Sequence, residues 1–200
     1  VKFKRYSRFF LFTFLEIREN MAVCGIDFGD KLTCIAQANR GGIDVVLDAG
    51  SQRLIPTLVS FQGKERFLGA AAAPKVRMNC KNTVKNTKRL LGRRWSDPAL
   101  QAEIRRCPFK CVQLSNDRVG IEAFYNDQPT TFTVEQCIAM MLQDCQATVA
   151  LSTGTKPADV VLSVPGYYTD VQRKALLHAS EISGLRCLSL LNDTTAAALS

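Results

Sequence analysis

The sequence has little histidine and tryptophan and lacks closely paired cysteines. Its 200 residues include one histidine, His178, one tryptophan and eight cysteines, none of them in a C-x-x-C pair. Zinc sites normally combine closely spaced cysteine and histidine ligands, so Cys107 and Cys111 are only a weak zinc candidate. The cysteines are spread over segments patterned like ordinary strands and helices, which favours reduced thiols over a disulfide framework. His178 has no acidic partner or paired serine in the pattern, and we expect a structural or exposed residue.

No apolar run is long enough to span a membrane, and no internal repeat or low-complexity segment is present. The apolar run at residues 9–15 is too short for a bilayer. Basic residues precede it, as in a signal peptide, but Glu16 and Glu19 follow it and a small-residue cleavage site is missing. We therefore interpret residues 1–20 as an extension outside the fold, and we expect no membrane partner.

The composition is that of a globular protein, with 46% hydrophobic and 22% charged residues. It excludes a disordered or collagen-like chain, and the length suits one domain or two small ones. The net charge of +8 comes from one stretch: residues 75–110 hold eleven basic and two acidic residues, against fifteen and sixteen elsewhere. Such a stretch can bind nucleic-acid phosphates, but it has two aromatic residues and no recognised binding signature. We expect no nucleic-acid partner.

Apolar segments and turn signals predict the secondary structure. Strands are expected at 23–28, 34–38, 43–47 and 58–61, as an antiparallel meander. Residues 67–91 favour helix, with Asn82 and Thr83 as the cap of a short helix that ends at Gly92. Residues 109–132 alternate like two or three strands.

Two capping-box signatures mark the second half of the chain. Thr133-x-x-Gln136 predicts a helix to about residue 151, and Thr169-x-x-Gln172 predicts one that stops at residue 184. Strands are expected at 160–164 and 187–191, followed by a helix capped at 192–194. A meander followed by strand, helix, strand and helix predicts an α/β fold, a mixed sheet with flanking helices.

Three charged residues stand where ligands could bind. Asp27 ends the first predicted strand before a glycine turn, where backbone N–H groups can cradle a phosphate and a carboxylate can hold Mg²⁺. Asp193 begins a helix directly after a buried strand, a usual ligand position in such sheets. Lys88 could reach a phosphate as a point charge. The alternatives are an ordinary hairpin turn, a helix cap and a solvated lysine.

Four segments, taken together, resemble one family. They are GIDFG at 25–29, NTVKNTKRLLGR at 82–93, SVPGYYTDVQR at 163–173 and NDTTAAAL at 192–199. Their order and spacing are similar to the ATPase domain of the heat-shock protein 70 superfamily. Phe28, residues 95–98 and the double threonine look most like the large 110-type branch of nucleotide-exchange partners. The resemblance implies the actin-like, ribonuclease-H-like ATPase fold, with residues 21–200 as lobe I, truncated before the second phosphate loop.

The resemblance also implies roles for the charged residues. Lys88 matches the lysine that contacts the transferring phosphate, with Arg89 beside it. Asp27 and Asp193 would hold Mg²⁺ through water, and Asp193 would help to position the attacking water, so Lys88 and Asp193 are the catalytic candidates. Aspartate at 193 replaces a longer glutamate, a displacement that would slow hydrolysis.

The first phosphate loop is implied at Gly29, Asp30 and Lys31. Ordinary members carry hydroxyl residues at the last two positions, so Asp30 adds an acid near the phosphates. This charge should weaken binding unless Lys31 or Mg²⁺ offsets it. Pro165 and Arg173 match a pair that relays nucleotide state toward the substrate-binding half.

The implied function is that of an ATP-binding chaperone or co-chaperone of the nucleotide-exchange type, acting in protein folding and the stress response. The implied ligands are ATP or ADP with Mg²⁺, and the implied partners are ordinary heat-shock protein 70 chaperones and unfolded polypeptides. The expected location is the cytoplasm, with the nucleus as a second compartment. Nucleotide in this fold lies between two lobes, so we expect little or no ATPase activity from these residues alone. A kinase of the same fold and a basic interaction module remain alternatives.

Overall fold

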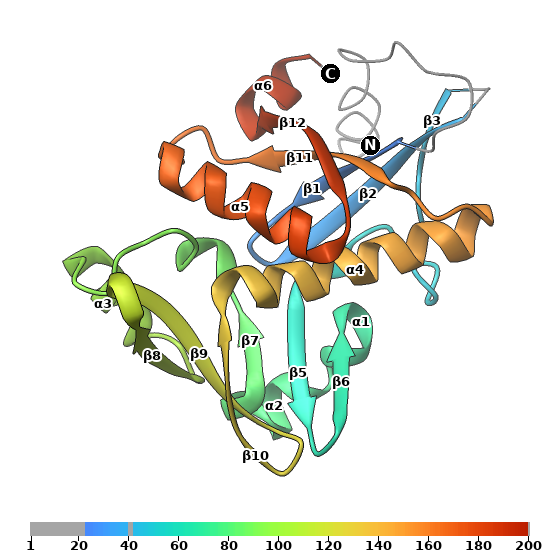
Figure 1. The fold of residues 1–200 in the computed structure, drawn as a ribbon. Helices are drawn as coiled ribbons and strands as arrows, with labels where there is room; N and C mark the ends of the chain where they lie inside the picture. Colours follow the sequence, from blue (N-terminus) through green and yellow to red (C-terminus); the bar gives the residue numbers. More distant parts are fainter. Residues whose placement is uncertain (1–22, 40–41, 200) are drawn as a thin grey trace.

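The computed structural model describes residues 23–39 and 42–199, and a six-stranded mixed sheet forms its upper part in Figure 1. The strand order is β12-β11-β1-β2-β3, and β4 pairs with β2. β1, β11 and β12 run parallel, whereas β2 is antiparallel to β1, β3 and β4. The carboxyl ends of the parallel strands therefore meet at one edge. The strands are β1 (Val23–Phe28), β2 (Leu32–Asn39), β3 (Gly42–Val45), β4 (Ile55–Pro56), β11 (Asp159–Val164) and β12 (Arg186–Asn192).

Two three-stranded antiparallel sheets lie below the large one in Figure 1, with strand orders β6-β5-β7 and β10-β9-β8. Residues 58–61 were expected as the fourth strand of the meander, but they belong to β5 in the first of these sheets. The reason is that the two-residue β4 completes the pairing with β2, and β5 pairs with β6 and β7 instead. The strands are β5 (Leu58–Gln62), β6 (Glu65–Leu68), β7 (Thr83–Lys85), β8 (Lys110–Leu114), β9 (Arg118–Tyr125) and β10 (Gln128–Thr133).

Two long helices, α4 (Val134–Thr153) and α5 (Asp170–Ser183), begin at the predicted capping boxes. In each box the threonine hydroxyl accepts from the backbone of a glutamine three residues later, and that glutamine accepts from the backbone of the threonine. Each helix ends at a glycine in the left-handed conformation, Gly154 or Gly184. Figure 1 shows α4 crossing between the large sheet and the small ones. Both predicted helices are confirmed.

The prediction of a short helix capped by Asn82 and Thr83 is wrong. Residues 83–85 form β7, because Thr83 and Val84 are buried against β5 and the Thr83 hydroxyl lies 2.9 Å from that of Ser60. A left-handed residue, Asn86, then leads into a single 3-10 turn that carries Lys88. The remaining short helices are α1 (Gly69–Ala72), α2 (Lys75–Met78), η2 (Cys80–Asn82), η3 (Thr87–Arg89), α3 (Pro98–Ile104), η4 (Ser115–Asp117) and α6 (Asp193–Ala198).

One continuous hydrophobic core joins the large sheet, α4 and the small sheets. Ile26 of β1, Leu142 of α4 and Phe61 of β5 are fully buried in it, and Phe61 stacks on Phe132 with ring centroids 4.6 Å apart. No helix in the described part of the chain is long and apolar enough to cross a membrane. The predicted extension at residues 1–20 lies outside the described residues.

Candidate functional site

The parallel strands bring Asp27 and Asp193 to the same edge of the large sheet. Asp27, in β1, is exposed, and its Oδ1 accepts a hydrogen bond of 2.7 Å from the hydroxyl of Ser163 in the neighbouring β11. Asp193 begins α6 directly after β12. Ser163 is buried in β11, so this hydrogen bond fixes the Asp27 carboxylate relative to the neighbouring strand. Ser163 was not among the predicted site residues, although it lies within one of the matched segments.

Lys88 reaches the same strand ends from η3. Its Nζ donates a hydrogen bond of 2.5 Å to the carbonyl of Phe28, the last residue of β1, and only 7% of the residue is exposed. Burial lowers the pKa of Lys88, while the negative charges of Asp193, Asp27 and Asp30 act in the opposite direction. A buried ammonium among three carboxylates is therefore the electrostatic centre of the site.

Two carboxylate oxygens beside this ammonium are buried and unpaired. Oδ1 of Asp193 and Oδ1 of Asp30 have no hydrogen-bond partner in the described part of the chain. Most buried polar atoms in proteins are paired, so such oxygens are candidate acceptors for a bound cation or its water ligands. The described residues hold no direct cluster of three metal ligands. Carboxylate oxygens are suitable partners for Mg²⁺ and for its water ligands, so the open oxygens of Asp30 and Asp193 fit a hydrated Mg²⁺ ion.

Gly29 permits the tight turn between β1 and β2. A Cβ at this position would lie 2.2 Å from the carbonyl oxygen of Leu32, so a larger residue does not fit without moving the backbone. The hydroxyl of Thr57 donates to the carbonyl of Gly29 at 3.0 Å, and the amide of Thr57 donates to the carbonyl of Lys31 at 2.9 Å. The buried Thr57 therefore anchors the loop through two hydrogen bonds, and it was not among the predicted site residues. The Lys31 side chain is exposed.

Arg89 contacts the loop through Asp30. Its Nε lies 2.6 Å from Oδ2 of Asp30, and its Nη1 lies 3.4 Å from Oε2 of Glu103 in α3. The hydrogen bond to Asp30 is the main reason that the pKa of Arg89 is raised. Lys31 or Mg²⁺ was expected to offset the charge of Asp30, whereas in the structure Arg89 is its ion-pair partner.

Pro165 and Arg173 lie in a network that joins Lys88 to the end of β12. Nη2 of Arg173 donates to Oδ1 of Asn192 at 2.7 Å, and its Nε donates to the carbonyl of Tyr168 at 3.1 Å. The carbonyl of Pro165 accepts from the Tyr168 amide at 3.0 Å, and the Tyr168 hydroxyl donates to the carbonyl of Lys88 at 2.7 Å. Tyr168 thus connects the two parts of the site; like Ser163, it lies within a matched segment but was not singled out as a site residue.

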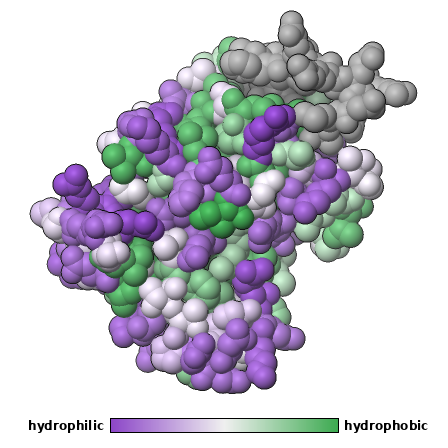
Figure 2. All heavy atoms as spheres, in the orientation of Figure 1, coloured by the Kyte–Doolittle hydropathy of each residue, from purple (hydrophilic) through white to green (hydrophobic). Residues whose placement is uncertain are grey.

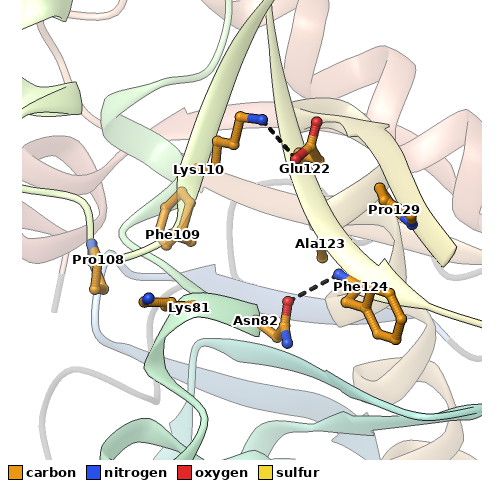
Figure 3. Close-up of a pocket in the computed structure, with 9 residues that line it drawn as sticks. All are labelled: Lys81, Asn82, Pro108, Phe109, Lys110, Glu122, Ala123, Phe124 and Pro129. Carbon is orange, nitrogen blue, oxygen red and sulfur yellow. Dashed lines mark hydrogen bonds and ion pairs between the residues drawn. The ribbon is translucent and has the colours of Figure 1, made fainter. Parts of the chain in front are cut away.

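A hollow of about 380 Å³ lies away from these residues, between η2 and the sheet of β8 and β9 (Figure 3). Its polar groups largely satisfy each other: Lys110 pairs with Glu122 at 2.8 Å, and Oδ1 of Asn82 accepts from the Phe124 amide at 2.9 Å. None of the predicted site residues lines it.

The basic stretch at residues 75–110 is largely a solvated and ion-paired surface. Figure 2 shows hydrophilic side chains gathered over the α3 end of the molecule. Arg89, Arg93, Arg106 and Lys110 each contact a carboxylate. Lys88 differs from these four residues because its ammonium is buried at the strand ends. His178, outside this stretch, is exposed on α5.

These features define the class of the protein. A mixed sheet with antiparallel β1, β2 and β3, followed by parallel β11 and β12 and flanking helices, is the ribonuclease-H-like core of the actin-like ATPase fold, and the described residues form part of one lobe. The fold predicted from the resemblance is confirmed.

A family model described as "Hsp70 protein" matches residues 23–200, and the chain therefore belongs to the Hsp70 family. It is 43% identical over 179 residues to the "97 kDa heat shock protein" of Strongylocentrotus purpuratus, covering 90% of this chain and 20% of that relative. It is 44% identical over 181 residues to the "Heat shock protein 110" of Caenorhabditis elegans, covering 90% and 23%. For the "Heat shock 70 kDa protein 4" of Homo sapiens the values are 43% over 180 residues, 90% and 21%.

The chain thus spans about a fifth of the length of the curated relatives it matches. The predicted resemblance to the 110-type branch is confirmed by these relatives.

Proposed function

We propose that the residues at the strand ends form part of a Mg·ATP site in an ATP-binding chaperone of the nucleotide-exchange type. The observation that carries the proposal is the buried ammonium of Lys88, held at the end of β1 near three carboxylates. Oδ1 of Asp30 and Oδ1 of Asp193 have no partner in the described part of the chain. A fixed cation suits a phosphate, and open carboxylate oxygens suit a hydrated divalent cation.

In this proposal each residue of the site has a distinct role in binding phosphate or Mg²⁺. Lys88 contributes positive charge to a phosphate, and the turn at Gly29 lets the backbone approach it closely. Asp27 and Asp193 would hold Mg²⁺ through water, and the bound Mg²⁺ would neutralise charge on the phosphate oxygens. Arg89 compensates the charge of Asp30, which reduces repulsion between the loop and an anion.

The exchange role rests on the resemblance to the 110-type branch and on the aspartate at 193. A shorter acid positions an attacking water less well, so we expect nucleotide binding with slow or absent hydrolysis. The proposed partners are ordinary Hsp70 chaperones and unfolded polypeptides, in the cytoplasm and the nucleus, in protein folding and the stress response.

Titration of the chain with millimolar Mg·ATP, followed by amide chemical shifts in NMR spectra, tests the site. We expect shifts at residues 27–31, at Lys88 and at Asp193, and no detectable heat by calorimetry at ordinary concentrations. The variant Lys88→Met should lose the shifts, whereas Lys85→Met, in the same stretch, should keep them. Shifts centred on the hollow of Figure 3 would contradict the proposed site. Micromolar affinity by calorimetry would contradict the view that these residues supply only part of it.

A chimera tests the exchange role. Residues 23–199 would replace the matching segment of the 97 kDa heat shock protein, and the release of fluorescent ADP from an ordinary Hsp70 chaperone would be measured. We expect faster release with the chimera than without it. A chimera that binds Mg·ATP and leaves the release rate unchanged would contradict the exchange role while sparing the site. Phosphorylation of a small sugar or of acetate would favour the kinase alternative.

A further inference from the structure

The hollow of Figure 3 lies beside the start of β8, and its wall is largely apolar. Pro108 and Phe109, which precede β8, form one side of it. Phe124 of β9 and Pro129 of β10, which pair with each other, form the other side. The volume of about 380 Å³ is in the usual range for ligand pockets, and Phe124 is 48% exposed. The hollow therefore has room for a side chain of a partner and an aromatic ring that it would contact.

The exposure of Phe124 is a consequence of its position in β9. Ile121 and Ala123 are buried in the core, and successive side chains of a strand point to opposite faces, so Phe124 lies on the outer face. Its backbone amide already donates to the side chain of Asn82 at 2.9 Å. A partner would therefore bind here through side chains and not by adding a strand at this amide.

Five basic residues lie around this hollow and a smaller one that adjoins it. Lys81 and Lys110 line the larger hollow. Lys85, Arg89 and Arg106 line the smaller one, of about 20 Å³, which shares two lining residues with the first. A cluster of cations around an apolar hollow favours a negatively charged partner.

The acids in the two linings are already paired. Glu122 contacts the ammonium of Lys110 at 2.8 Å, and Glu103 contacts two arginines at 3.0 and 3.4 Å. By contrast, neither Lys81 nor Lys85 makes an ion pair with any residue that the structure describes. The positive charge of these two lysines is therefore open to a partner, one lysine in each hollow.

We propose that this surface binds an acidic segment of another protein that carries one apolar anchor side chain. The anchor would fill the hollow between Phe109 and Phe124, and carboxylates before and after it would contact Lys81 and Lys85. Such an anchor gives affinity, and the flanking charges give specificity and a faster encounter. The surface does not include Asp27, Lys88 or Asp193, so the proposal is independent of the proposed nucleotide site.

A nucleic acid is the other polyanion that a basic surface could bind. Its backbone would use the cations alone, and its bases would stack on open aromatic faces. Between the cations, however, the surface is built from two prolines and two phenylalanines, and Phe109 is only 4% exposed. An acidic polypeptide supplies apolar side chains for such a surface as well as negative charge, so it is the better match.

Fluorescence anisotropy of the whole chain with a labelled peptide, Asp-Glu-Asp-Phe-Glu-Asp-Glu, tests the proposal. We expect a Kd below about 0.1 mM that increases as sodium chloride is raised from about 0.05 to about 0.5 M. A peptide with Ala in place of Phe, and another with Lys in place of each acid, should bind at least about tenfold more weakly. Equal affinity for the three peptides, or tighter binding of a labelled oligothymidylate, would overturn the proposal.

Paired variants locate the binding surface. Lys81→Glu and Phe124→Ala should each raise the Kd of the acidic peptide at least about fivefold, because they remove the open charge and the exposed ring. The controls are Lys156→Glu and Leu151→Ala, which change an exposed lysine and an exposed leucine at the far end of α4 and should leave the Kd unchanged. Unchanged affinity in both test variants would contradict binding at this hollow. The peptide comparisons on the wild type decide the proposal even where a variant fails to fold.

Discussion

The carboxylates at the two ends of the parallel strands differ in whether they have a hydrogen-bond partner. At the amino end of β11, the carboxylate of Asp159, in a residue only 2% exposed, is held by Arg186 at 2.6 Å to Nε and 2.8 Å to Nη2. At the carboxyl end, Asp30 and Asp193 each keep a buried oxygen that has no partner within the described ranges. The same strands therefore carry a closed ion pair at one end and open acceptors at the other.

The ion pair at the amino end stabilises the fold, whereas the unpaired oxygens at the carboxyl end point to a binding site. A buried acceptor without a partner costs stability, typically about 1–3 kcal/mol, and proteins seldom leave one open. The closed pair at Asp159 needs no ligand, whereas the open oxygens gain partners only when something binds. This contrast supports a ligand site at the carboxyl end, where ligands in open α/β sheets usually bind.

The largest effect on stability is expected from removing the ion pair at the amino end of the strands. Asp159→Ala removes both charge-assisted hydrogen bonds of the carboxylate, and the free energy of unfolding should fall by about 3 kcal/mol. Urea unfolding followed by circular dichroism measures the change. Asp170→Ala, which removes an exposed carboxylate, is the control and should leave stability nearly unchanged. A decrease in the free energy of unfolding of less than about 1 kcal/mol in Asp159→Ala would show that the ion pair with Arg186 contributes little to stability.

A second test concerns the turn at the open end. Gly29→Ala brings a Cβ against the Leu32 carbonyl and should lower the free energy of unfolding by about 2 kcal/mol. Gly166→Ala is the matched control at the same edge, because the nearest atom to its Cβ is the Thr194 hydroxyl at 3.8 Å. Its stability should change by less than about 0.5 kcal/mol, measured by the same unfolding experiment. Equal losses in the two variants would contradict the close approach at Gly29.

Alkaline pH should act on the two ends with opposite sign. Burial raises the pKa of Cys24, beside Asp159, from 9.0 to about 12. The stability that the neutral thiol contributes is present below pH 9.0 and is lost as the pH rises toward 12, by up to about 1.4 kcal/mol per pH unit. The pKa of Lys88 in the folded chain is lowered from its ordinary value of 10.5. Between these two pKa values, the unfolded chain still carries the proton on Lys88 and the folded chain has released it. Raising the pH through that window therefore favours folding at this site.

Urea unfolding under reducing conditions, from about pH 8 to pH 11, measures both contributions. Cys24→Ala should lose stability less steeply with pH than the wild type does, and Lys88→Met more steeply. Identical slopes in the three proteins would show that neither group is coupled to folding.

The smallest effect on stability is expected at Arg89. Its side chain is 46% exposed, so Arg89→Ala should change the free energy of unfolding by no more than about 0.5 kcal/mol. Asp30 would lose its partner, and the NMR shifts caused by Mg·ATP should become weaker. Arg93→Ala, which removes another surface pair, should leave those shifts unchanged. Unweakened shifts in Arg89→Ala would show that the charge of Asp30 does not matter for the ligand.

The helices were the most predictable part of the fold. A capping box and a glycine after the last turn are local signals, and they marked α4 and α5 almost to the residue. Residues 83–85 were predicted as helix because Asn82 and Thr83 resemble a cap. Pairing with β5, more than twenty residues earlier, outweighed that local preference.

The site was predictable in its members but not in its contacts. The resemblance assigned Asp27, Lys88 and Asp193 to one site, and the structure brings the two carboxylates near the same ammonium. The partners Ser163 for Asp27 and Arg89 for Asp30 lie 136 and 59 residues away in the sequence. No local pattern encodes hydrogen bonds at such separations.

The sequence by itself determined the family, the order of the main strands and helices, and the presence of acids at the ends of two strands. These features depend on local patterns and short motifs. Only the tertiary structure decided which charges are paired and which stay open. The reason is that β1, β11 and β12 become neighbours across more than 130 residues of chain, and that arrangement pairs Asp159 with Arg186 while it leaves oxygens of Asp30 and Asp193 available.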